Sequence, residues 1–424
     1  MKNRPELLVP AGSLEKLKVG LQYGADAFYL GIPAFSMRSR ITNFTTASVM
    51  EGVELIRKAG KKFYITTNIY PRGLKVDAFK HHIEFLRDEV KPDAVIVADD
   101  GVFDMFREYA PKIPLHISVQ ANLLNYRAVQ FWQKQGASRV ILPRELTLDE
   151  IRVIHEKVPE MELEAFVHGA ICVSYSGRCL LSAYMTGRDA NQGACAHSCR
   201  WKYRLHNDFS MGERVEALKD EDQLYLEEEK RPGEFMPIEE DEHGTYIMNS
   251  RDMCLLPFLK ELTDAGICSF KVEGRNKTEH YLGTVTRAYR QAIDDMMVDK
   301  ELDESLLEDL HKTANRGFIP GFMKGFPGKE NIYYEKNAPI QSHKFIGIVK
   351  EDRGDGLYVV EIRNKLERGE VVEVMMPDGQ FEIEVSEMFG LDGEPLESVH
   401  GGAGEKLLKL KEGLCKNSFI RIKI

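Results

Sequence analysis

The sequence lacks long apolar segments. Its longest apolar runs are of strand length, such as Ala94–Ala98, whereas a membrane-spanning helix needs roughly 20 apolar residues in a row. The first residues lead directly into a strand-like pattern, without the apolar core of a secretion signal. We therefore expect a cytoplasmic protein that does not enter the membrane.

Several common catalytic motifs are also missing. The sequence contains no H-E-x-x-H, no G-x-S-x-G and no phosphate-binding P-loop. The usual signatures of zinc peptidases, serine hydrolases and nucleotide hydrolases are therefore absent. No G-x-G-x-x-G follows the first predicted strand, where the chain has Pro10-Ala11-Gly12-Ser13. This absence weakens the case for a dinucleotide-binding open sheet.

Positive charge is not in excess. The chain has 57 Lys and Arg residues against 67 Asp and Glu residues, which gives a formal net charge of -10. A general attraction to nucleic acid is therefore not expected. A contact with RNA would need a local basic segment, and the candidates are 200–204 and the lysine-rich end of the chain, 406–423.

What the sequence does contain is a regular alternation of short apolar strands and amphipathic helices. Such alternation predicts parallel strands joined by right-handed crossover helices. An eighth strand, 268–273, follows after an interruption and precedes a long helical pattern at 278–297. We therefore predict an α/β fold with a TIM-like (β/α) barrel, and the alternative is a doubly wound open sheet. The seven earlier strands are predicted at Glu6–Pro10, Ala27–Gly31, Lys62–Asn68, Ala94–Ala98, Leu115–Val119, Arg139–Leu142 and Leu163–Val167.

Composition divides the chain into successive regions. Residues 1–315 form the predicted barrel, which a cysteine-rich insertion interrupts at about 172–243. Glycines and prolines at 316–340 predict a linker. Beyond it, 341–424 contains short strands of alternating polarity and a Pro377-Asp378-Gly379 turn. These features predict a small antiparallel C-terminal β-barrel.

Four of the seven cysteines lie within 28 residues, in the spacing C-x6-C-x15-C-x3-C. They are Cys172, Cys179, Cys195 and Cys199. Disulfides are not expected in a reducing compartment, and the odd total also argues against a disulfide framework. Thiolates gathered in this way bind either zinc or an iron–sulfur cluster.

The spacing favours an iron–sulfur cluster over zinc. Structural zinc sites use close pairs of cysteines, and only Cys195 and Cys199 approach that spacing. The alternative to metal binding is that the four cysteines are buried and pack as small apolar side chains. Cys254, in a segment predicted to open a helix at 252–254, is an alternative to Cys199 as the fourth ligand.

Polar side chains follow the predicted strands at their C-terminal ends, where the active sites of TIM barrels lie. Glu273 and Arg275 follow the last strand. We predict that they bind an anionic substrate, and the alternative is a structural ion pair. His116, Glu164 and Lys271 lie within strands, where alternation can turn them toward the barrel interior. The other predicted site residues at strand ends are Asn68, Gln120, Arg144 and His168.

Several motifs resemble those of the collagenase-like peptidase family, family thirty-two among the peptidases of unknown catalytic type. They extend from Leu7-Leu8-Val9-Pro10-Ala11-Gly12-Ser13 to Phe270-Lys271-Val272-Glu273-Gly274-Arg275. The acidic segment at 229–245 and the C-terminal β-domain resemble the tRNA hydroxylation branch of this family. The cysteine-containing motifs that carry the resemblance are Glu164–Cys172, Ser176–Ser182, Asn191–Cys195 and Cys199–Trp201.

The resemblance implies an iron–sulfur protein that forms 5-hydroxyuridine at the wobble position of tRNA, with prephenate as co-substrate. It implies a cluster, taken as 4Fe–4S, on the four cysteines. Prephenate is a dicarboxylate, so an arginine such as Arg275 or Arg144 can hold a carboxylate through two hydrogen bonds. The uridine base must leave its stack, and the aromatic residues Tyr175, Trp201 and Tyr203 are predicted to receive it. Asn68 is also predicted to bind substrate. The residues to which we assign catalytic roles are Glu273, Arg275, His168 and Gln120.

Two other functions remain open at this stage. One is a peptidase, which is the historical label of the family. The other is a non-catalytic scaffold that binds tRNA or a partner enzyme through the C-terminal barrel, which resembles the second domain of translation elongation factors. A homologous partner subunit is compatible with each of these functions.

Overall fold

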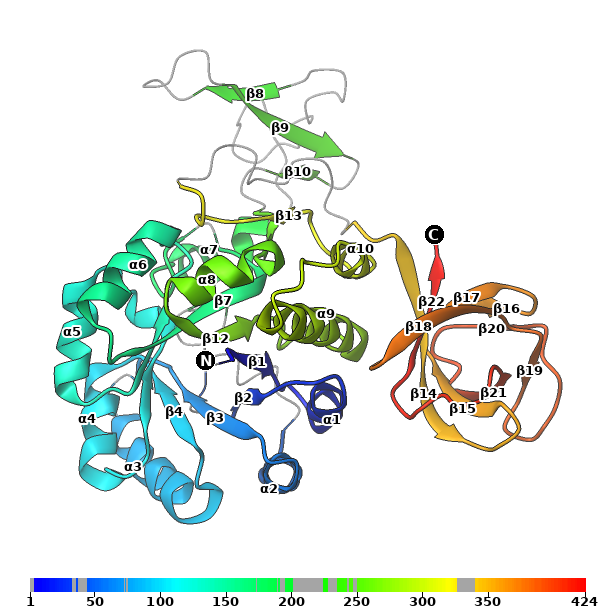
Figure 1. Ribbon diagram of the computed structural model, residues 1–424, viewed down its shortest axis with the longest axis horizontal. Coiled ribbons are helices and arrows are strands. Elements are labelled where there is room, and N and C mark those ends of the chain that lie inside the picture. The colour runs from blue at the N-terminus through cyan, green and yellow to red at the C-terminus, as the bar shows by residue number, and fades with distance from the viewer. Residues whose placement is uncertain are drawn as a thin grey trace, which may run out of the picture.

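In the computed structural model, drawn as a ribbon in Figure 1, eight parallel strands close into a barrel. Strand β12 pairs in parallel with both β1 and β7, and this double pairing completes the ring. The predicted TIM-like barrel is therefore confirmed, and the open-sheet alternative is wrong. The barrel strands are β1 (Glu6–Pro10), β2 (Ala27–Gly31), β3 (Lys62–Thr67), β4 (Ala94–Val97), β5 (Leu115–Ile117), β6 (Arg139–Leu142), β7 (Glu162–Ala170) and β12 (Ile267–Val272).

The structure describes only part of the insertion and of the linker. The described residues are 4–32, 36, 44–71, 73, 75–172, 174–188, 190, 195–200, 224–227, 235–241, 244–246, 250–325 and 340–424.

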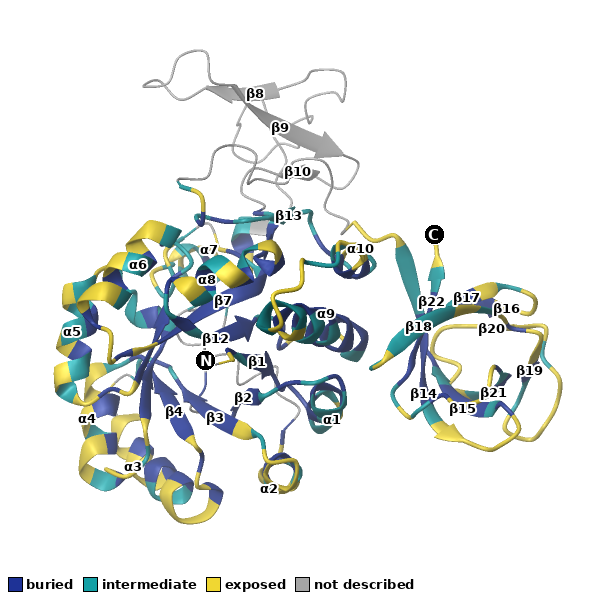
Figure 2. Cartoon of the chain, in the orientation of Figure 1, coloured by how far each residue is buried: buried dark blue, intermediate teal, exposed yellow. Residues whose placement is uncertain are grey.

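Helices cover the outside of the barrel, so the strands between them are buried, as Figure 2 shows. Leu7, Leu8 and Val9 of β1 are completely buried because one face of the strand lines the barrel and the other packs against helices. Several helices begin at a side chain that accepts a backbone N–H bond, such as Ser13 before α1 and Thr147 before α6. The helices are α1 (Leu14–Gln22), α2 (Thr46–Lys58), α3 (Lys75–Phe85), α4 (Asp100–Tyr109), α5 (Tyr126–Gln135), α6 (Leu148–Lys157), α7 (Leu181–Thr186), α8 (Leu259–Asp264), α9 (Glu279–Met297) and α10 (Ser305–His311).

The insertion leaves and rejoins the barrel at one place. Strand β11 (Asp252–Cys254) pairs antiparallel with the end of β7, so that Asp252 lies opposite Ala170. The prediction that 252–254 opens a helix is therefore wrong, because these residues extend the sheet before the chain turns into α8. Strand β13 (Phe318–Ile319) pairs in parallel with β11. Within the insertion, β8 (Leu224–Glu227), β9 (Phe235–Asp241) and β10 (Gly244–Tyr246) form a separate antiparallel sheet.

The C-terminal domain is a seven-stranded antiparallel sheet in the order β18-β17-β22-β14-β15-β21-β19, with a separate β16–β20 pair. Within the fully described segment 340–424, the outer strands β18 and β19 do not pair with each other, so the sheet is a half-barrel. Its core contains Ile346, Val360, Val374 and Ile420. The strands are β14 (His343–Asp352), β15 (Leu357–Ile362), β16 (Leu366–Glu367), β17 (Val371–Met376), β18 (Gly379–Glu384), β19 (Glu387–Phe389), β20 (Ser398–Val399), β21 (Glu405–Lys409) and β22 (Phe419–Lys423).

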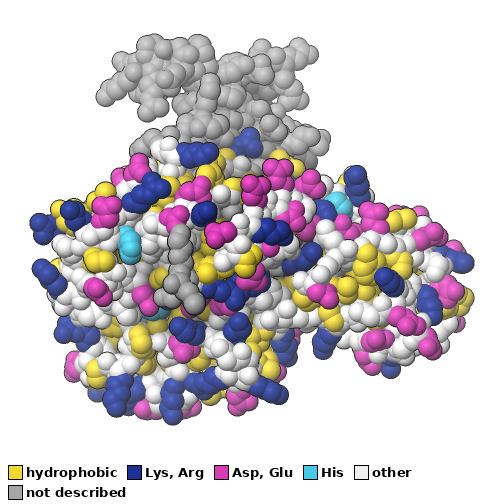
Figure 3. Space-filling view, in the orientation of Figure 1, with side chains coloured by type: hydrophobic (Ala, Val, Ile, Leu, Met, Phe, Trp, Pro, Cys, Tyr) yellow, Lys and Arg dark blue, Asp and Glu magenta, His cyan; other side chains and the backbone are white. Residues whose placement is uncertain are grey.

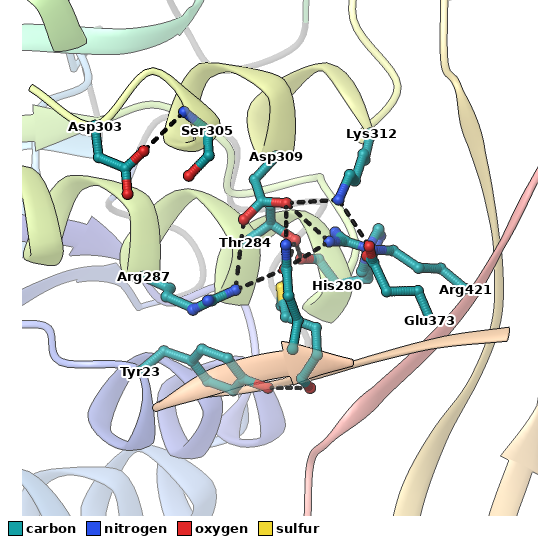
Figure 4. Close-up of polar contacts among 12 residues, drawn as sticks. Tyr23, His280, Thr284, Arg287, Asp303, Ser305, Asp309, Lys312, Glu373 and Arg421 are labelled. Atoms are coloured by element: carbon teal, nitrogen blue, oxygen red, sulfur yellow. Dashed lines mark hydrogen bonds and ion pairs between the residues drawn. The ribbon is translucent and has the colours of Figure 1, made fainter. Parts of the chain in front are cut away.

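A buried polar cluster joins the two domains (Figure 4). Arg421 of β22 is completely buried and binds Asp309 of α10, with 3.0 Å between Nη2 and Oδ1. Arg421 also pairs with Glu373 of β17, and Lys312 contacts both carboxylates at 2.9 and 2.8 Å. The Tyr23 hydroxyl, next to α1, donates to the Asn417 carbonyl oxygen at 2.9 Å. These contacts hold the half-barrel against the helical layer of the barrel.

The surface carries both signs of charge. On the face shown in Figure 3, Lys and Arg side chains lie among Asp and Glu side chains. Within the described part of the chain, no helix combines the length and the apolar character needed to cross a membrane.

Candidate active site

Charged residues fill the interior of the barrel below its C-terminal end. Arg139 of β6 lies 2.8 Å from Glu6 of β1 and 3.1 Å from Glu164 of β7. Glu164 Oε1 lies 2.6 Å from Lys271 Nζ on β12. Each of these buried charges thus has a partner of opposite sign, as buried charges require. The alternation of the sequence predicted that Glu164 and Lys271 face the barrel interior, and they do. It did not predict that Arg139 joins Glu164 to Glu6.

Burial changes the proton affinity of these groups. It raises the pKa of the Glu164 carboxyl, but Lys271 and Arg139 outweigh this effect and hold the pKa below its usual value. Burial lowers the pKa of the Lys271 ammonium, against the opposing effect of Glu164. Burial and the nearby Arg139 lower the pKa of His116 to about 3, so its ring is neutral at pH 7. Burial thus disfavours the charged form of Lys271, and its ion pair with Glu164 favours that form.

Above this layer, at the C-terminal ends of the strands, lies a cavity with a volume of about 220 Å³. Lys271, together with Tyr29 and Phe166, forms part of its wall. The cavity lies where TIM barrels carry their active sites. The predicted site residues that line it are Asn68, Gln120, Arg144, Glu273 and Arg275.

Three cations reach this cavity: Arg144 from the loop after β6, Lys271 from β12 and Arg275 from the loop after β12. The Arg144 guanidinium lies 3.8 Å from the centre of the Phe166 ring. The Lys271 ammonium lies 4.5 Å from the centre of the Tyr29 ring. Arg275 is 7% exposed, and its Nη1 donates to Ser36 Oγ at 3.2 Å. With Glu273 as the carboxylate on the same wall, the lining is net positive and suits an anionic ligand.

A pair of amides forms another part of the wall. Asn68 Nδ2 donates to Gln120 Oε1 at 2.5 Å, and the Tyr70 hydroxyl donates to the Gln120 carbonyl oxygen at 2.8 Å. Gln120 is 2% exposed. Gln120 Oε1 thus already accepts a hydrogen bond from Asn68. Gln120 Nε2 is a buried donor that makes no hydrogen bond within the described residues, so it is available to a ligand.

All four predicted cluster ligands line this same cavity: Cys172, Cys179, Cys195 and Cys199. The loop that carries the first two packs directly on the barrel, because a Cβ added at Gly177 would lie 2.7 Å from the Gln120 carbonyl oxygen. The Ser176 N–H donates to Glu145 Oε1 at 2.9 Å, which ties the loop to the end of β6. The tertiary structure thus places the cysteines over the strand ends.

The second pair of cysteines is held by its own contacts. The Ser182 hydroxyl of α7 accepts the Ala196 N–H at 2.8 Å, which ties Ala196, the neighbour of Cys195, to α7. The His197 N–H donates to Cys195 Sγ at 3.4 Å. Hydrogen bonds from backbone amides to cysteine sulfur are among the interactions by which proteins tune iron–sulfur clusters.

The donor set fits an iron–sulfur cluster. No disulfide joins any of the seven cysteines, all of which lie in the described part of the chain. Among the described residues, no three Cys, His, Asp or Glu side chains converge closely enough to hold a metal ion. Four cysteines line one cavity, and cysteine sulfur is the donor type that iron–sulfur clusters use.

Cys254 does not reach the cavity. Its side chain is 6% exposed, and its Sγ lies 3.7 Å from the Tyr289 hydroxyl of α9. Burial raises the pKa of this thiol to about 11, which disfavours the thiolate. The alternative that Cys254 replaces Cys199 as fourth ligand is therefore not supported.

The cysteine motifs and the C-terminal sheet identify the family. The family model described as peptidase family U32 matches residues 12–333, and the model of the U32 C-terminal domain matches residues 341–421. The chain belongs to peptidase family U32. The resemblance inferred from the motifs is thus confirmed.

Curated relatives of this U32 protein carry two kinds of name. The tRNA hydroxylation protein P of Escherichia coli (strain K12) is 39% identical over 417 residues, which cover 94% of this chain and 92% of that protein. The tRNA hydroxylation protein P of Haemophilus influenzae is 39% identical over 438 residues, which cover 98% of this chain and 95% of that protein. A protein named collagenase from Porphyromonas gingivalis is 32% identical over 336 residues, or 76% of this chain and 73% of that protein.

One predicted catalytic residue of the U32 chain, His168, does not line the cavity. His168 is completely buried, and its ring lies 5.5 Å from that of Tyr289 and 5.2 Å from that of Phe318. The register of β7 against β12 shifts between Phe166 and His168, so the alternation of inward and outward side chains is broken there. His168 therefore faces the outer layer rather than the cavity, and burial lowers its pKa to about 3. This geometry does not support the prediction that His168 is catalytic, because its ring cannot contact a substrate in the cavity.

Trp201 and Tyr203, predicted to bind the base, lie outside the described residues. In this U32 barrel, residues that the sequence prediction did not select also line the cavity, notably Tyr29, Thr66 and Phe166. Each is an inward-facing position of its strand, so the period-two pattern of the strands was the available signal.

Proposed function

We propose that this U32 protein hydroxylates tRNA, converting the wobble uridine to 5-hydroxyuridine with an iron–sulfur cluster and prephenate. One observation carries the proposal: four cysteines and the polar residues of the barrel strand ends line a single cavity. The two relatives named tRNA hydroxylation protein P match more than nine tenths of this chain, so the names bear on both of its domains.

In this proposal Cys172, Cys179, Cys195 and Cys199 hold a 4Fe–4S cluster at the cavity wall. A cluster there would exchange single electrons with a molecule bound in the cavity. The His197 N–H bond to Cys195 Sγ supports this assignment, because it stabilises negative charge on the sulfur. The protein itself positions the reactants and handles protons.

Prephenate in turn occupies the positive side of the cavity. Its two carboxylates match the guanidinium groups of Arg144 and Arg275, which can each make two parallel hydrogen bonds. Arg275 is held in place by Ser36, so little side-chain freedom is lost on binding. Lys271 lies on the same wall and adds positive charge.

The uridine base enters the cavity after it has left its stack in the RNA. The Gln120 Nε2 donor, oriented by Asn68, suits a uracil carbonyl oxygen. Replacing C5–H by C5–OH takes two electrons from the base and releases the C5 proton. In this proposal prephenate is the two-electron acceptor, and its own C–OH bond breaks as it is reduced. Glu273 is the carboxylate on the cavity wall that we assign to accept this proton.

The test is complementation of a deletion strain, with the modified nucleosides of its tRNA measured by mass spectrometry. The wild-type gene restores 5-hydroxyuridine, whereas Cys172→Ala and Arg275→Ala do not. Cys268→Ser is the matched control, because this cysteine donates to the Leu163 carbonyl oxygen and is not among the residues that line the cavity. Full 5-hydroxyuridine in the Arg275→Ala strain would refute the role of Arg275.

Anaerobic purification separates the proposal from the alternatives. A brown protein with equal amounts of iron and sulfide supports it, and Cys172→Ala should lose both. A peptidase is the second candidate, favoured by the relative named collagenase and by the presence of His197 beside the cavity cysteines. Proteolysis that survives iron removal and persists in Cys172→Ala would support the peptidase. A colourless protein with normal tRNA affinity would instead indicate a scaffold.

A further inference from the structure

Large apolar side chains are exposed in the segment that carries Cys172 and Cys179. Tyr184 is 91% exposed, Leu180 70%, Tyr175 52% and Met185 46%. Tyr175 also lines the cavity itself. We call these four side chains the rim surface. Exposed apolar side chains that occur together mark interaction sites more often than single ones do.

The rim surface belongs to a fixed segment. Leu180 and Tyr184 lie one turn apart, because the Tyr184 N–H donates to the Leu180 carbonyl oxygen at 2.9 Å. Gly187 ends α7 in the left-handed conformation, and the Ser182 hydroxyl ties the helix to Ala196. The same segment contains Cys172 and Cys179, so the rim surface and the cavity wall are parts of one structure.

The charge of this segment differs from that of the whole chain. Residues 170–188 contain Arg178 and Arg188 and no acidic residue, although the net charge of the chain is -10. Both arginines are exposed. Aromatic side chains interleaved with arginines are the composition of surfaces that bind single-stranded nucleic acid by stacking.

We propose that the rim surface binds the single-stranded RNA on either side of the target nucleotide. A neighbouring base stacks on Tyr184, the target base passes Tyr175 into the cavity, and Arg178 and Arg188 meet the phosphates. This inference rests on the proposed function, because it takes the cavity as the place where a base is modified. It adds the residues that hold the RNA outside the cavity, which neither the strand-end residues nor the cysteines supply.

The test measures binding apart from catalysis. The full-length protein, purified without air, is titrated into a fluorescein-labelled anticodon stem–loop RNA with uridine at the wobble position, and the anisotropy is recorded. Tyr184→Ala weakens the affinity about tenfold, as expected for the loss of one stacked base. Tyr184→Phe keeps the ring and binds within about twofold of the wild type. Phe131→Ala is the matched control, because Phe131 is an exposed aromatic residue (55%) on α5.

Salt dependence tests the arginines. Arg178→Gln lowers the slope of log Kd against log salt concentration by about one, as expected for one lost phosphate contact. Phe131→Ala leaves that slope unchanged. Equal slopes for Arg178→Gln and the wild type would contradict the phosphate contact.

Two further outcomes would overturn the inference. Wild-type affinity in Tyr184→Ala refutes the stacking contact, even where Cys172→Ala abolishes 5-hydroxyuridine in cells and the proposed function stands. A lower molecular mass of Tyr184→Ala by light scattering, with unchanged RNA affinity, would show that a second copy of the chain covers the rim surface. If the wild-type gene fails to restore 5-hydroxyuridine, the proposed function fails instead, whatever the stem–loop titration gives.

Discussion

Lys271 Nζ lies 2.6 Å from Glu164 Oε1 inside the closed barrel, where the two side chains are only 4% and 0% exposed. The pair joins two levels of the protein, because Lys271 lines the cavity while Glu164 contacts Arg139 in the layer below. An ion pair at this depth is costly to break, since the remaining partner would be a buried charge without compensation.

Lys271→Met should lower the free energy of unfolding by about 3 kcal/mol, because Glu164 loses its nearest counter-charge. The double variant Lys271→Met with Glu164→Gln should regain most of this loss, which urea unfolding would measure. If Lys271 also acts in the cavity, the double variant stays defective in forming 5-hydroxyuridine despite its restored stability. A wild-type level of 5-hydroxyuridine in the double variant would show that Lys271 has only a structural role.

Gly177→Ala should displace the cysteine loop from the barrel. The added Cβ would lie 2.7 Å from the Gln120 carbonyl oxygen, and Gly177 has a φ of +71°. We expect the iron content of the purified protein to fall severalfold while the thermal unfolding of the barrel changes little. Gly187→Ala is the matched control, since Gly187 has a φ of +68° but no atom of the described residues lies within 4 Å of where its Cβ would be. Equal iron losses in the two variants would point to backbone strain alone.

Arg421→Met should loosen the C-terminal half-barrel. It leaves Asp309 and Glu373 without the buried guanidinium between them, at a cost of about 3 kcal/mol. We expect the half-barrel to unfold at a lower temperature than in the wild type, which thermal unfolding followed by circular dichroism would measure. Tyr23→Phe removes one hydroxyl from the same interface and should cost only about 1 kcal/mol. A single unfolding transition of unchanged midpoint in Arg421→Met would contradict this account.

His82→Phe should reduce the sensitivity of the fold to mild acid. Burial lowers the pKa of His82 to about 4, below its ordinary value of 6.5. Between these values the unfolded chain takes up a proton that the folded chain does not, so the free energy of unfolding falls as the pH decreases. His82 should account for about 2 kcal/mol of the stability lost between pH 7 and pH 5. Urea unfolding at both pH values would show a smaller loss in the variant, and an equal loss would refute it.

Some features of the site were open to sequence prediction and others were not. Asn68, Gln120, Arg144, Glu273 and Arg275 follow strands, and in a closed parallel barrel all strand ends meet at one rim. His168 follows the same pattern but faces outward, because a register shift between two strands leaves no mark in either strand alone. Cys254 was considered as a ligand from its place in the chain, although its pairing opposite His168 turns it toward α9.

The sequence by itself determined the alternation of strands and helices, because the period of apolar residues records which faces are buried. It also determined the family and the four cysteines. Only the tertiary structure decided that Gly177 rests on Gln120, that Lys271 is paired with Glu164, and that Arg421 is buried between the domains. Each of these contacts joins residues at least 48 positions apart, and such contacts depend on how whole strands and domains pack, which local patterning does not encode.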